Sequence, residues 1–248
     1  MYRSVTGREF MEKTKYQYLP QSDQSMGLPQ PPLEMVWPAG GTVVDLPDPA
    51  SLKVKPVDLS TAINDRRSIR DYSTEPLTLE ELSYLLWCTQ GVRESTQRPA
   101  TLRTVPSAGA RHPFETFVLA TNVAGLEPGI YAYLAGEHKL RVHKLGAELG
   151  AKVAEVAYRQ QMVARGAATF IWAAVAYRSI WRYGERAYRY FHLDAGHVCA
   201  HLYLAVQPVG CGCCGIAAFD DDGINDLLGL DGVDEFVVYL GTVGKLRQ

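Results

Sequence analysis

The chain has 248 residues, of which 47% are hydrophobic and 21% charged, so it suits one sizeable domain or two small ones with an ordinary globular core. Its formal net charge of −2 excludes a general nucleic-acid-binding protein, because affinity for the phosphate backbone needs a broad excess of Lys and Arg. The longest apolar run, residues 167–177, is shorter than the roughly 20 residues of a membrane-spanning helix, so no membrane partner is expected.

The N-terminus and the cysteines favour a reducing compartment. The opening sequence MYRSVTGREF lacks the apolar core of a secretory signal. The five cysteines are odd in number, and three of them cluster within residues 211–214, which is not the pattern of a disulfide framework. We therefore expect a cytoplasmic protein.

Residues 1–56 hold eight of the fourteen prolines. Proline fixes φ and removes a backbone donor, so no long helix or central strand is expected in this segment. We predict that residues 1–56 form an extension that packs on the surface of the protein or on a partner subunit. Residues 57–248 would then form the main domain.

Regular patterns begin with two helices, a short one near residues 57–68 and a clear one over residues 77–91. In the second, Thr78 and Glu81 have the spacing of a capping box, and Gly91 marks the end. The other expected elements are a polar loop (93–104), a strand (114–122), a hairpin that turns at Gly136 (129–145), a helix (147–166), a buried strand (168–177), a long helix (185–208) and a final strand (235–244). Because helices and strands mix without strict alternation, the pattern favours an α+β fold with helices packed on a sheet.

Two basic clusters are candidates for an anion site. Arg66, Arg67 and Arg70 surround Ser68, and a guanidinium group matches phosphate oxygens in a bidentate way. Lys245 and Arg247 directly follow the final strand. The alternatives are a solvated charged surface for the first cluster and a frayed basic tail for the second.

The sequence PSAGARHP places Ser107, Ala108 and Gly109 between Pro106 and Pro113, just before a strand. Small residues allow backbone N–H groups to approach a ligand closely, although a plain loop is an equal alternative.

The sequence GCGCCG at 210–215 offers Cys211, Cys213 and Cys214 as thiol ligands, with His197 on a nearby helix. The spacing is not that of a zinc pair, so small buried thiols are the preferred interpretation and no metal is expected. The sequence also matches G-x-G-x-x-G, but it follows a helix rather than a strand, which is the wrong context for a dinucleotide site.

Taken in order, RRSIRDY, LTLEEL, PSAGARHP, GIYAYL, GIAAFD and the terminal GTVGKLR give the chain a family resemblance. Over about residues 57–248 it resembles the nitroreductase-like flavoprotein superfamily, and within it the SagB-type (thiazole/oxazole dehydrogenase-like) branch. The resemblance implies an FMN cofactor and a mainly antiparallel sheet flanked by helices. It also implies an intertwined homodimer with FMN at the subunit interface.

The resemblance assigns the first cluster to FMN. Arg66, Arg67 and Ser68 correspond to the group that holds the phosphate and the ribityl chain. Arg70 corresponds to the cation at the N1/O2 edge of the ring, where it would stabilise the reduced flavin. Lys245 and Arg247 correspond to C-terminal phosphate ligands.

The resemblance also assigns two backbone segments. The loop of Pro106, Ser107, Ala108 and Gly109 would reach the flavin of the other subunit. A second segment would direct backbone N–H groups at N5 and O4 of the ring; its residues are Ile216, Ala217 and Ala218.

The expected function is an FMN-dependent oxidoreductase that passes hydride through flavin N5, from NAD(P)H to a small electrophile such as a nitroaromatic, a quinone or an enone. One alternative is an azoline dehydrogenase acting on a modified ribosomal peptide. That branch uses a Lys-Tyr pair, and here the matching residues are Arg182 and Tyr183; Arg does not serve as a base, which leaves Tyr183 as the candidate proton-handling group. A second alternative is a non-enzymatic flavin or thiol-metal module.

Overall fold

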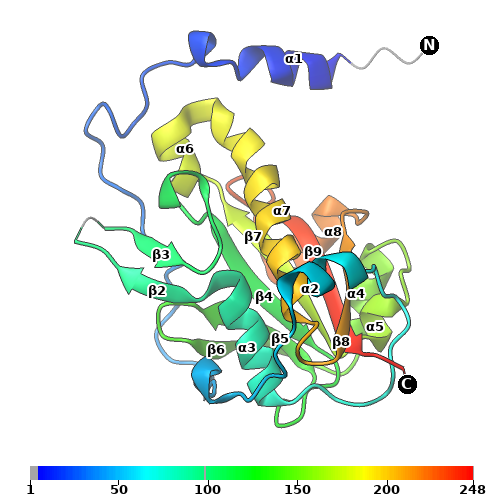
Figure 1. Cartoon of the computed structure of the whole chain (residues 1–248). Helices are drawn as coiled ribbons and strands as arrows, with labels where there is room; N and C mark the ends of the chain where they lie inside the picture. The colour runs from blue at the N-terminus through cyan, green and yellow to red at the C-terminus, as the bar shows by residue number, and fades with distance from the viewer. Residues whose placement is uncertain (1–4, 98, 248) are drawn as a thin grey trace.

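The computed structural model describes residues 5–97 and 99–247. Its centre is a seven-stranded sheet in the order β1-β6-β5-β4-β7-β9-β8, in which every neighbouring pair is antiparallel (Figure 1). The strands are β1 (Val43–Asp45), β4 (Phe114–Ala120), β5 (Gly129–Leu134), β6 (Lys139–Leu145), β7 (Ala168–Val175), β8 (Cys211–Ile216) and β9 (Glu235–Lys245). A separate hairpin pairs β2 (Val92–Ser95) with β3 (Thr101–Arg103).

Helices cover both faces of the sheet (Figure 1). The α-helices of the described residues are α1 (Thr6–Lys13), α2 (Leu59–Asp65), α3 (Leu79–Gln90), α4 (Leu149–Val156), α5 (Met162–Arg165), α6 (Tyr177–Tyr183), α7 (Ala187–Ala205) and α8 (Asp221–Leu228), and of these α1 and α2 lie outside the two covering layers. Alternation along β7 places Phe170 and Trp172 on the face covered by α3 and α7, and Ile171 and Ala173 on the face covered by α4, α5 and α8. The α+β fold expected from the sequence is confirmed.

The helix α3 begins and ends as its sequence predicts. Thr78 Oγ1 accepts a hydrogen bond from the Glu81 N–H (3.2 Å), and the Glu81 carboxylate accepts one from the Thr78 N–H (2.9 Å). Gly91 follows the last residue of the helix. This capping box fixes Glu81, whose carboxylate also accepts a hydrogen bond from Lys245 at the end of β9.

Two expectations about local structure were wrong, and one strand was not predicted. Residues 93–104 are not a loop, because they contain most of the β2–β3 hairpin. The helix expected over residues 147–166 is broken into α4 and α5, since Tyr158 and Arg159 adopt positive φ angles of 52° and 60° between them. The sequence GCGCCG is itself largely a strand, β8, although glycine is disfavoured in strands.

The N-terminal segment runs along the outside of the fold (Figure 1). It contributes the edge strand β1, which pairs with β6, and the eight-residue helix α1, which lies near the N-terminal end of α7. The Trp181 Nε1–H donates to the Leu28 carbonyl (2.9 Å), so this segment is fixed on α6 as well. A domain boundary at residue 56 stays a prediction. Within the part of the chain that the structure describes, no helix combines the length and the apolar character needed to cross a membrane.

Candidate active site

The basic segment 66–70 lies against β8, the last strand of the sheet. It follows α2, whose first turn is capped by the Asp58 carboxylate. Ser68 forms a parallel bridge with Cys213, and the Ile69 N–H donates to the Cys213 carbonyl (2.9 Å). The backbone of this segment is therefore fixed along the sheet edge, while its arginine side chains extend from it.

Tyr203 on α7 links this segment to the end of β8. Its hydroxyl lies 3.0 Å from Ser68 Oγ and accepts a hydrogen bond from the Gly215 N–H (2.8 Å). The Arg66 guanidinium lies 5.1 Å from the centroid of the Tyr203 ring, within range of a cation–π contact. Burial raises the pKa of Tyr203, which keeps its phenol neutral and able to donate to Ser68. The sequence does not single out Tyr203, because nothing in a helical repeat marks which side chain meets a distant loop.

The three arginines of the cluster differ in their surroundings. Arg67 Nη1 donates to the carbonyls of Asn64 (2.7 Å) and Arg66 (2.9 Å), so it satisfies the C-terminal end of α2. Arg70 Nη1 reaches the Ser68 carbonyl at 3.4 Å. Among the three, Arg66 and Arg70 are the better placed to meet a ligand.

The C-terminal pair lies at the same end of the sheet as the basic segment. The Ser73 N–H donates to the Lys245 carbonyl (2.9 Å), and Arg247 Nε donates to the Tyr72 carbonyl (3.1 Å). Arg247 also forms an exposed ion pair with Asp71 (3.0 Å). The structure thus places the C-terminal pair beside residues 71–73, which directly follow the basic segment.

The Lys245 ammonium has its own partners. Lys245 Nζ donates to Glu81 Oε1 (2.5 Å) and to the Val209 carbonyl (3.1 Å). Burial opposes the charged form, but the hydrogen bond to Glu81 and the nearby charges of Cys211, Glu81 and Glu75 together outweigh it, so the pKa of Lys245 is raised. Lys245 is therefore a cation, and it forms an ion pair with the Glu81 carboxylate.

The loop 106–109 is attached to α7 through Asp194, another residue that the sequence does not single out. Ser107 Oγ donates to Asp194 Oδ2 (2.5 Å) and the Ala108 N–H donates to Asp194 Oδ1 (3.2 Å). Ser107 Oγ in turn accepts a hydrogen bond from the His112 N–H (2.9 Å). Asp194 is 3% exposed; burial raises its pKa, and the hydrogen bond from Ser107 opposes that rise.

This loop does not meet the basic segment of the same chain. Asp194 and Tyr203, which hold the two segments, lie about 14 Å apart along α7 at roughly 1.5 Å per residue. A ligand that contacts both the loop and the basic segment of one chain would have to span this distance. The alternative is that the loop contacts a ligand bound to another protein molecule.

Tyr183 lies at the C-terminal end of α6, directly against the loop. An ideal Cβ on Gly109, whose φ is +58°, would lie 2.3 Å from the Tyr183 hydroxyl, so only glycine allows this approach. The ring packs edge-on against Tyr190 with centroids 4.8 Å apart, and the Arg182 guanidinium lies 5.6 Å from its centroid. The structure therefore brings Tyr183 to the loop, and not to the basic segment.

The segment of Ile216, Ala217 and Ala218 begins at the last residue of β8. Ile216 is buried, whereas Ala217 and Ala218 are exposed. The Ala218 carbonyl accepts a hydrogen bond from Gln160 Nε2 (2.9 Å). Because Gly215 bonds to Tyr203, this segment lies close to Ser68 and so to the first basic cluster.

The cysteine cluster does not form a metal site. Alternation along β8 directs Cys211 and Cys213 to the α7 face of the sheet and Cys214 to the opposite face. Across residues 5–97 and 99–247, no three side chains of the His, Cys, Asp and Glu types are arranged to hold a metal ion. The thiol-metal alternative therefore has no support in the geometry.

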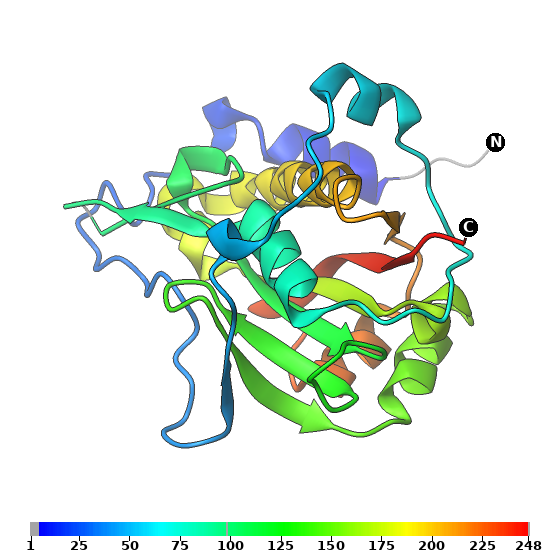
Figure 2. The ribbon, with the colours of Figure 1, turned by 60° about the horizontal axis from the view of Figure 1, so that its bottom comes forward.

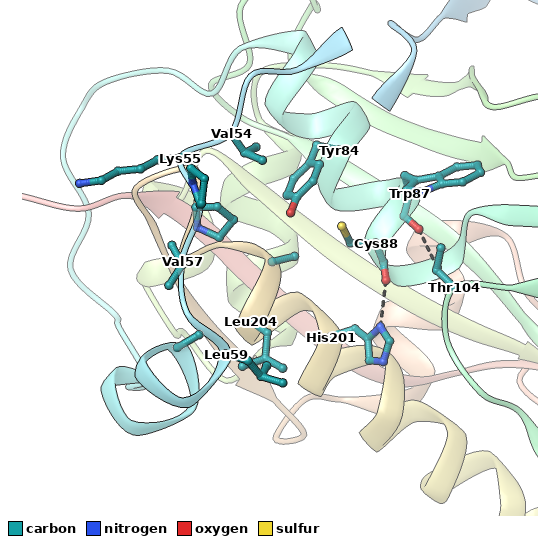
Figure 3. A pocket seen from close by; sticks show the side chains of 14 residues that line it. Val54, Lys55, Val57, Leu59, Tyr84, Trp87, Cys88, Thr104, His201 and Leu204 are labelled. Carbon is teal, nitrogen blue, oxygen red and sulfur yellow. Dashed lines mark hydrogen bonds between the residues drawn. The ribbon is translucent and has the colours of Figure 1, made fainter. Parts of the chain in front are cut away.

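An open pocket of about 440 Å³ lies between α3, α7 and the segment that leads into α2 (Figure 3). Its lining includes Tyr84, Trp87, Cys88 and Leu204. His201 lines it too, with its Nδ1–H donating to the Cys88 carbonyl (3.1 Å). The lining is mainly apolar and joins the outer faces of two helices, which is typical of a surface that another chain covers.

The chain is similar to known proteins both in sequence and in fold. The model of the Nitroreductase family matches residues 63–245. A Methanocaldococcus jannaschii protein described as a nitroreductase is 35% identical over 202 residues, which cover 82% of this chain and 96% of that protein. The trifolitoxin-processing protein TfxB of Rhizobium leguminosarum bv. trifolii is 36% identical over 113 residues, which cover 44% of this chain and 30% of that protein.

A solved structure from Anabaena variabilis, also described as a nitroreductase, matches with a TM-score of 0.64 and 33% identity. The match covers 75% of this chain and 37% of that chain, so the two proteins share one unit of the longer molecule. The family match and the relative from M. jannaschii both span most of the sequence. The chain belongs to the nitroreductase family of FMN-dependent oxidoreductases.

Proposed function

We propose that the protein binds FMN at the edge of β8 and transfers hydride between NAD(P)H and a small electrophile. The observation that carries this proposal is the group of donors at one end of the sheet. The Arg66 guanidinium and the Ser68 hydroxyl both contact Tyr203. Lys245 and Arg247 lie beside the residues that follow this basic segment. This set of cations and a hydroxyl fits a phosphate monoester, which carries nearly two negative charges.

Arg66 and Ser68 would hold the phosphate, and Arg247 and Lys245 would complete the site. Lys245 contributes by sharing its ammonium between Glu81 and the phosphate, since three N–H donors are available on one side chain. Arg67 lies within the family motif, but its hydrogen bonds to the end of α2 give it a supporting part in ordering the segment.

Arg70 and the residues after β8 would face the ring. FMN, when bound, supplies hydride exchange at its N5 atom. The Arg70 charge would stabilise negative charge at the N1/O2 edge, as a fixed charge does for any developing anion. The exposed backbone of Ala217 and Ala218 follows Gly215, and it is the segment that would present N–H groups to the opposite edge.

A homodimer would supply the loop of Pro106, Ser107, Ala108 and Gly109. Within one chain this loop is held about 14 Å from the basic segment along α7. Apolar side chains stand exposed on the neighbouring helices: Leu193 on α7 is 58% exposed, and Leu59 and Ile63 on α2 are 64% and 57% exposed. Figure 2 shows α2 standing away from the sheet, and only Ala62 in it is buried. A second copy that covers α2, α7 and the pocket of Figure 3 would bury these groups and bring its own loop to the site.

The electrophile would be a nitroaromatic, a quinone or an enone, with NADH or NADPH as the reductant. Tyr183 is the residue that would donate a proton near the loop, because its hydroxyl is the titratable group that approaches Gly109. Arg182 beside it would supply positive charge to stabilise the negative charge that develops on the oxygen of the acceptor as it is reduced.

A second candidate function is the oxidation of azoline rings in a ribosomal peptide. It is favoured by the similarity to TfxB, whose name describes the processing of trifolitoxin. The Arg182-Tyr183 sequence, where that branch has a Lys-Tyr pair, counts against it. A peptide that carries an azoline ring, offered to the purified protein without NAD(P)H, separates the two functions, because only the dehydrogenase would convert it.

The test of the main proposal is the visible spectrum of the purified protein, followed by mass identification of whatever heat releases. We expect a yellow protein that yields about one FMN per chain and oxidises NADH or NADPH when a quinone or nitroaromatic is added. A colourless protein that takes up no added FMN would reject the proposal. A yellow protein without turnover on any of these acceptors or on the azoline peptide would leave a non-enzymatic flavin module.

A further inference from the structure

A pocket of about 330 Å³ lies between the β2–β3 hairpin and the loop of residues 105–112. Its lining includes Arg93 on β2, Arg103 on β3 and His112, together with the apolar side chains of Leu102 and Val105. The described residues that line it include no Asp and no Glu. The charge and the composition of these walls therefore suit an anion that is carried on a small apolar body.

The buried arginines beside this pocket are poorly balanced by acids. Arg103 is 5% exposed; its Nη1 donates to the neutral Gln90 side chain (3.1 Å), and Glu34 lies 3.9 Å from its Nη2, beyond hydrogen-bond distance. Arg111 is 4% exposed, and its Nε donates to the Arg178 carbonyl (3.0 Å). Within the described parts of the chain, Arg111 Nη2 has no hydrogen-bond partner. Two buried guanidinium groups next to the pocket thus lack a closely bound carboxylate.

His112 reports the sign of the potential at the pocket wall. Burial, with the charges of Arg103 and Arg111, lowers the pKa of His112 from 6.5 to about 3. The histidine is therefore neutral near pH 7, and the two cations that disfavour its charged form would favour an anion in the adjoining space. Asp194 accepts hydrogen bonds from Ser107 Oγ and the Ala108 N–H, but it does not line the pocket.

The pocket shares part of its wall with the loop that we assign to the flavin of the partner subunit. Pro106 and Ser107 belong to both, whereas the residues of the hairpin have no part in the FMN site. A molecule in the pocket would therefore lie beside the flavin that this loop approaches. The volume exceeds what a lone carboxylate needs and is sufficient for a single ring that carries one.

We propose that this pocket binds the anionic group of the electron acceptor, so that the preferred acceptors are aromatic carboxylates rather than neutral compounds. This inference rests on the proposed function, because the pocket meets a flavin only in the assembled site. Arg93 pairs with the carboxylate; it is exposed and, among the described residues, forms no ion pair of its own. The buried charges of Arg103 and Arg111 favour the anion at longer range, and Leu102 and Val105 contact the ring.

The test compares two acceptors that differ in one charged group, 4-nitrobenzoate and the neutral 4-nitrobenzyl alcohol, with the purified holoprotein and saturating NADH. Arg93→Gln should raise the KM for 4-nitrobenzoate by about fivefold, since it removes a charge-assisted contact, and change the KM for the alcohol by less than about twofold. Arg93→Lys keeps the charge and should recover most of the loss. The control is Arg165→Gln on α5, an exposed arginine outside the pocket, which should leave both KM values unchanged.

A second measurement separates binding in the pocket from the chemistry. Calorimetric titration of 4-nitrobenzoate into the purified protein without reductant should give a dissociation constant about fivefold weaker in Arg93→Gln than in the wild type. A protein that holds no FMN or reduces no acceptor would reject the proposed function, and the titration would then decide by itself whether the pocket binds the anion.

Three results would overturn the proposal. One is an equal change in the KM for both acceptors in Arg93→Gln, which would indicate general damage to the hairpin. The second is 4-nitrobenzoate binding that Arg93→Gln does not weaken. The third is a rise in the KM for NADPH in Arg93→Gln without a rise for NADH or 4-nitrobenzoate, which would assign the pocket to the coenzyme phosphate. In each case, continued turnover of the neutral acceptor would leave the proposed function standing.

Discussion

The Glu115 carboxylate on β4 accepts hydrogen bonds from the Arg178 guanidinium on α6 and from the Met35 N–H (2.7 Å). Both charged residues are buried, at 7% and 1% exposed, and Arg178 Nε also donates to the Pro32 carbonyl (3.1 Å). One ion pair therefore joins the sheet, a helix and the proline-rich N-terminal segment.

Glu115→Gln should lower the free energy of unfolding by about 3 kcal/mol, because it leaves a buried guanidinium without its counter-charge. Urea unfolding measures this loss. The control is Glu148→Gln, which removes the acid of an exposed pair with Lys152 and should change stability by less than about 0.5 kcal/mol. Equal stability of the two variants would show that the buried pair contributes nothing.

Arg66→Ala and Lys245→Ala should each weaken the retention of FMN by about tenfold or more, since each removes a charge-assisted contact to the phosphate. Titration of the apoprotein with FMN, followed by fluorescence, measures the dissociation constants. Arg93→Ala on β2 is the control for a general loss of positive charge. Glu81→Gln breaks the same ion pair as Lys245→Ala but keeps the cation, so it should retain FMN. Wild-type affinity in Arg66→Ala and Lys245→Ala would contradict the shared phosphate site.

Gly109→Ala should destabilise the protein and reduce FMN binding together. Its new Cβ would meet the Tyr183 hydroxyl at 2.3 Å, and the loop would have to move. Gly125→Ala is a matched control, because Gly125 also has a positive φ, +86°, and a Cβ added there would meet nothing within 4 Å. Thermal unfolding should show a larger loss for Gly109→Ala; the same small loss in both would mean that only the backbone conformation matters there.

His112 should make the fold sensitive to mild acid. Burial, with the charges of Arg103 and Arg111, lowers the pKa of His112 from 6.5 to about 3. Below about pH 6.5 this histidine is protonated in the unfolded chain but stays neutral in the folded chain. His112 therefore does not reduce the free energy of unfolding above that pH, and it reduces it progressively as pH falls toward 3.

His112→Asn removes the titrating group and keeps a residue that tolerates the positive φ of 44° found here. The free energy of unfolding should then fall less between pH 7 and pH 5 than in the wild type. Parallel slopes in the two proteins would assign the acid sensitivity to other groups.

The sequence predicts an element correctly where residues close together in the chain determine it. The capping box of Thr78 and Glu81 and the stop at Gly91 are local, and α3 has those ends. The apolar run of β7 is likewise local, because a strand covered on both faces needs apolar residues throughout.

Prediction from the sequence failed where distant residues decide the outcome. No propensity predicts β8 from GCGCCG, because that strand forms by pairing with β9, and its small residues leave room for Tyr239 and Ile69. Asp194 and Tyr203 hold the loop and the basic segment, yet each looks like an ordinary position of a helix. The order of the family motifs singles out these segments as candidates, which stays a prediction, and the structure adds the side chains that hold them in place.

The N-terminal segment has a consequence for how the chain is made. Its hydrogen bonds run from Thr14 to Arg186, from Tyr16 to Tyr190, from Leu28 to Trp181 and from β1 to β6. During synthesis it leaves the ribosome before these partners, and more than a hundred further residues must follow before most of them exist. Until then the proline-rich segment has no partners to pack against. It docks near the end of folding, because contacts between residues so far apart in the sequence form slowly. A ribosome stalled before residue 177 should therefore carry this segment open to protease, and release of the full chain should protect it.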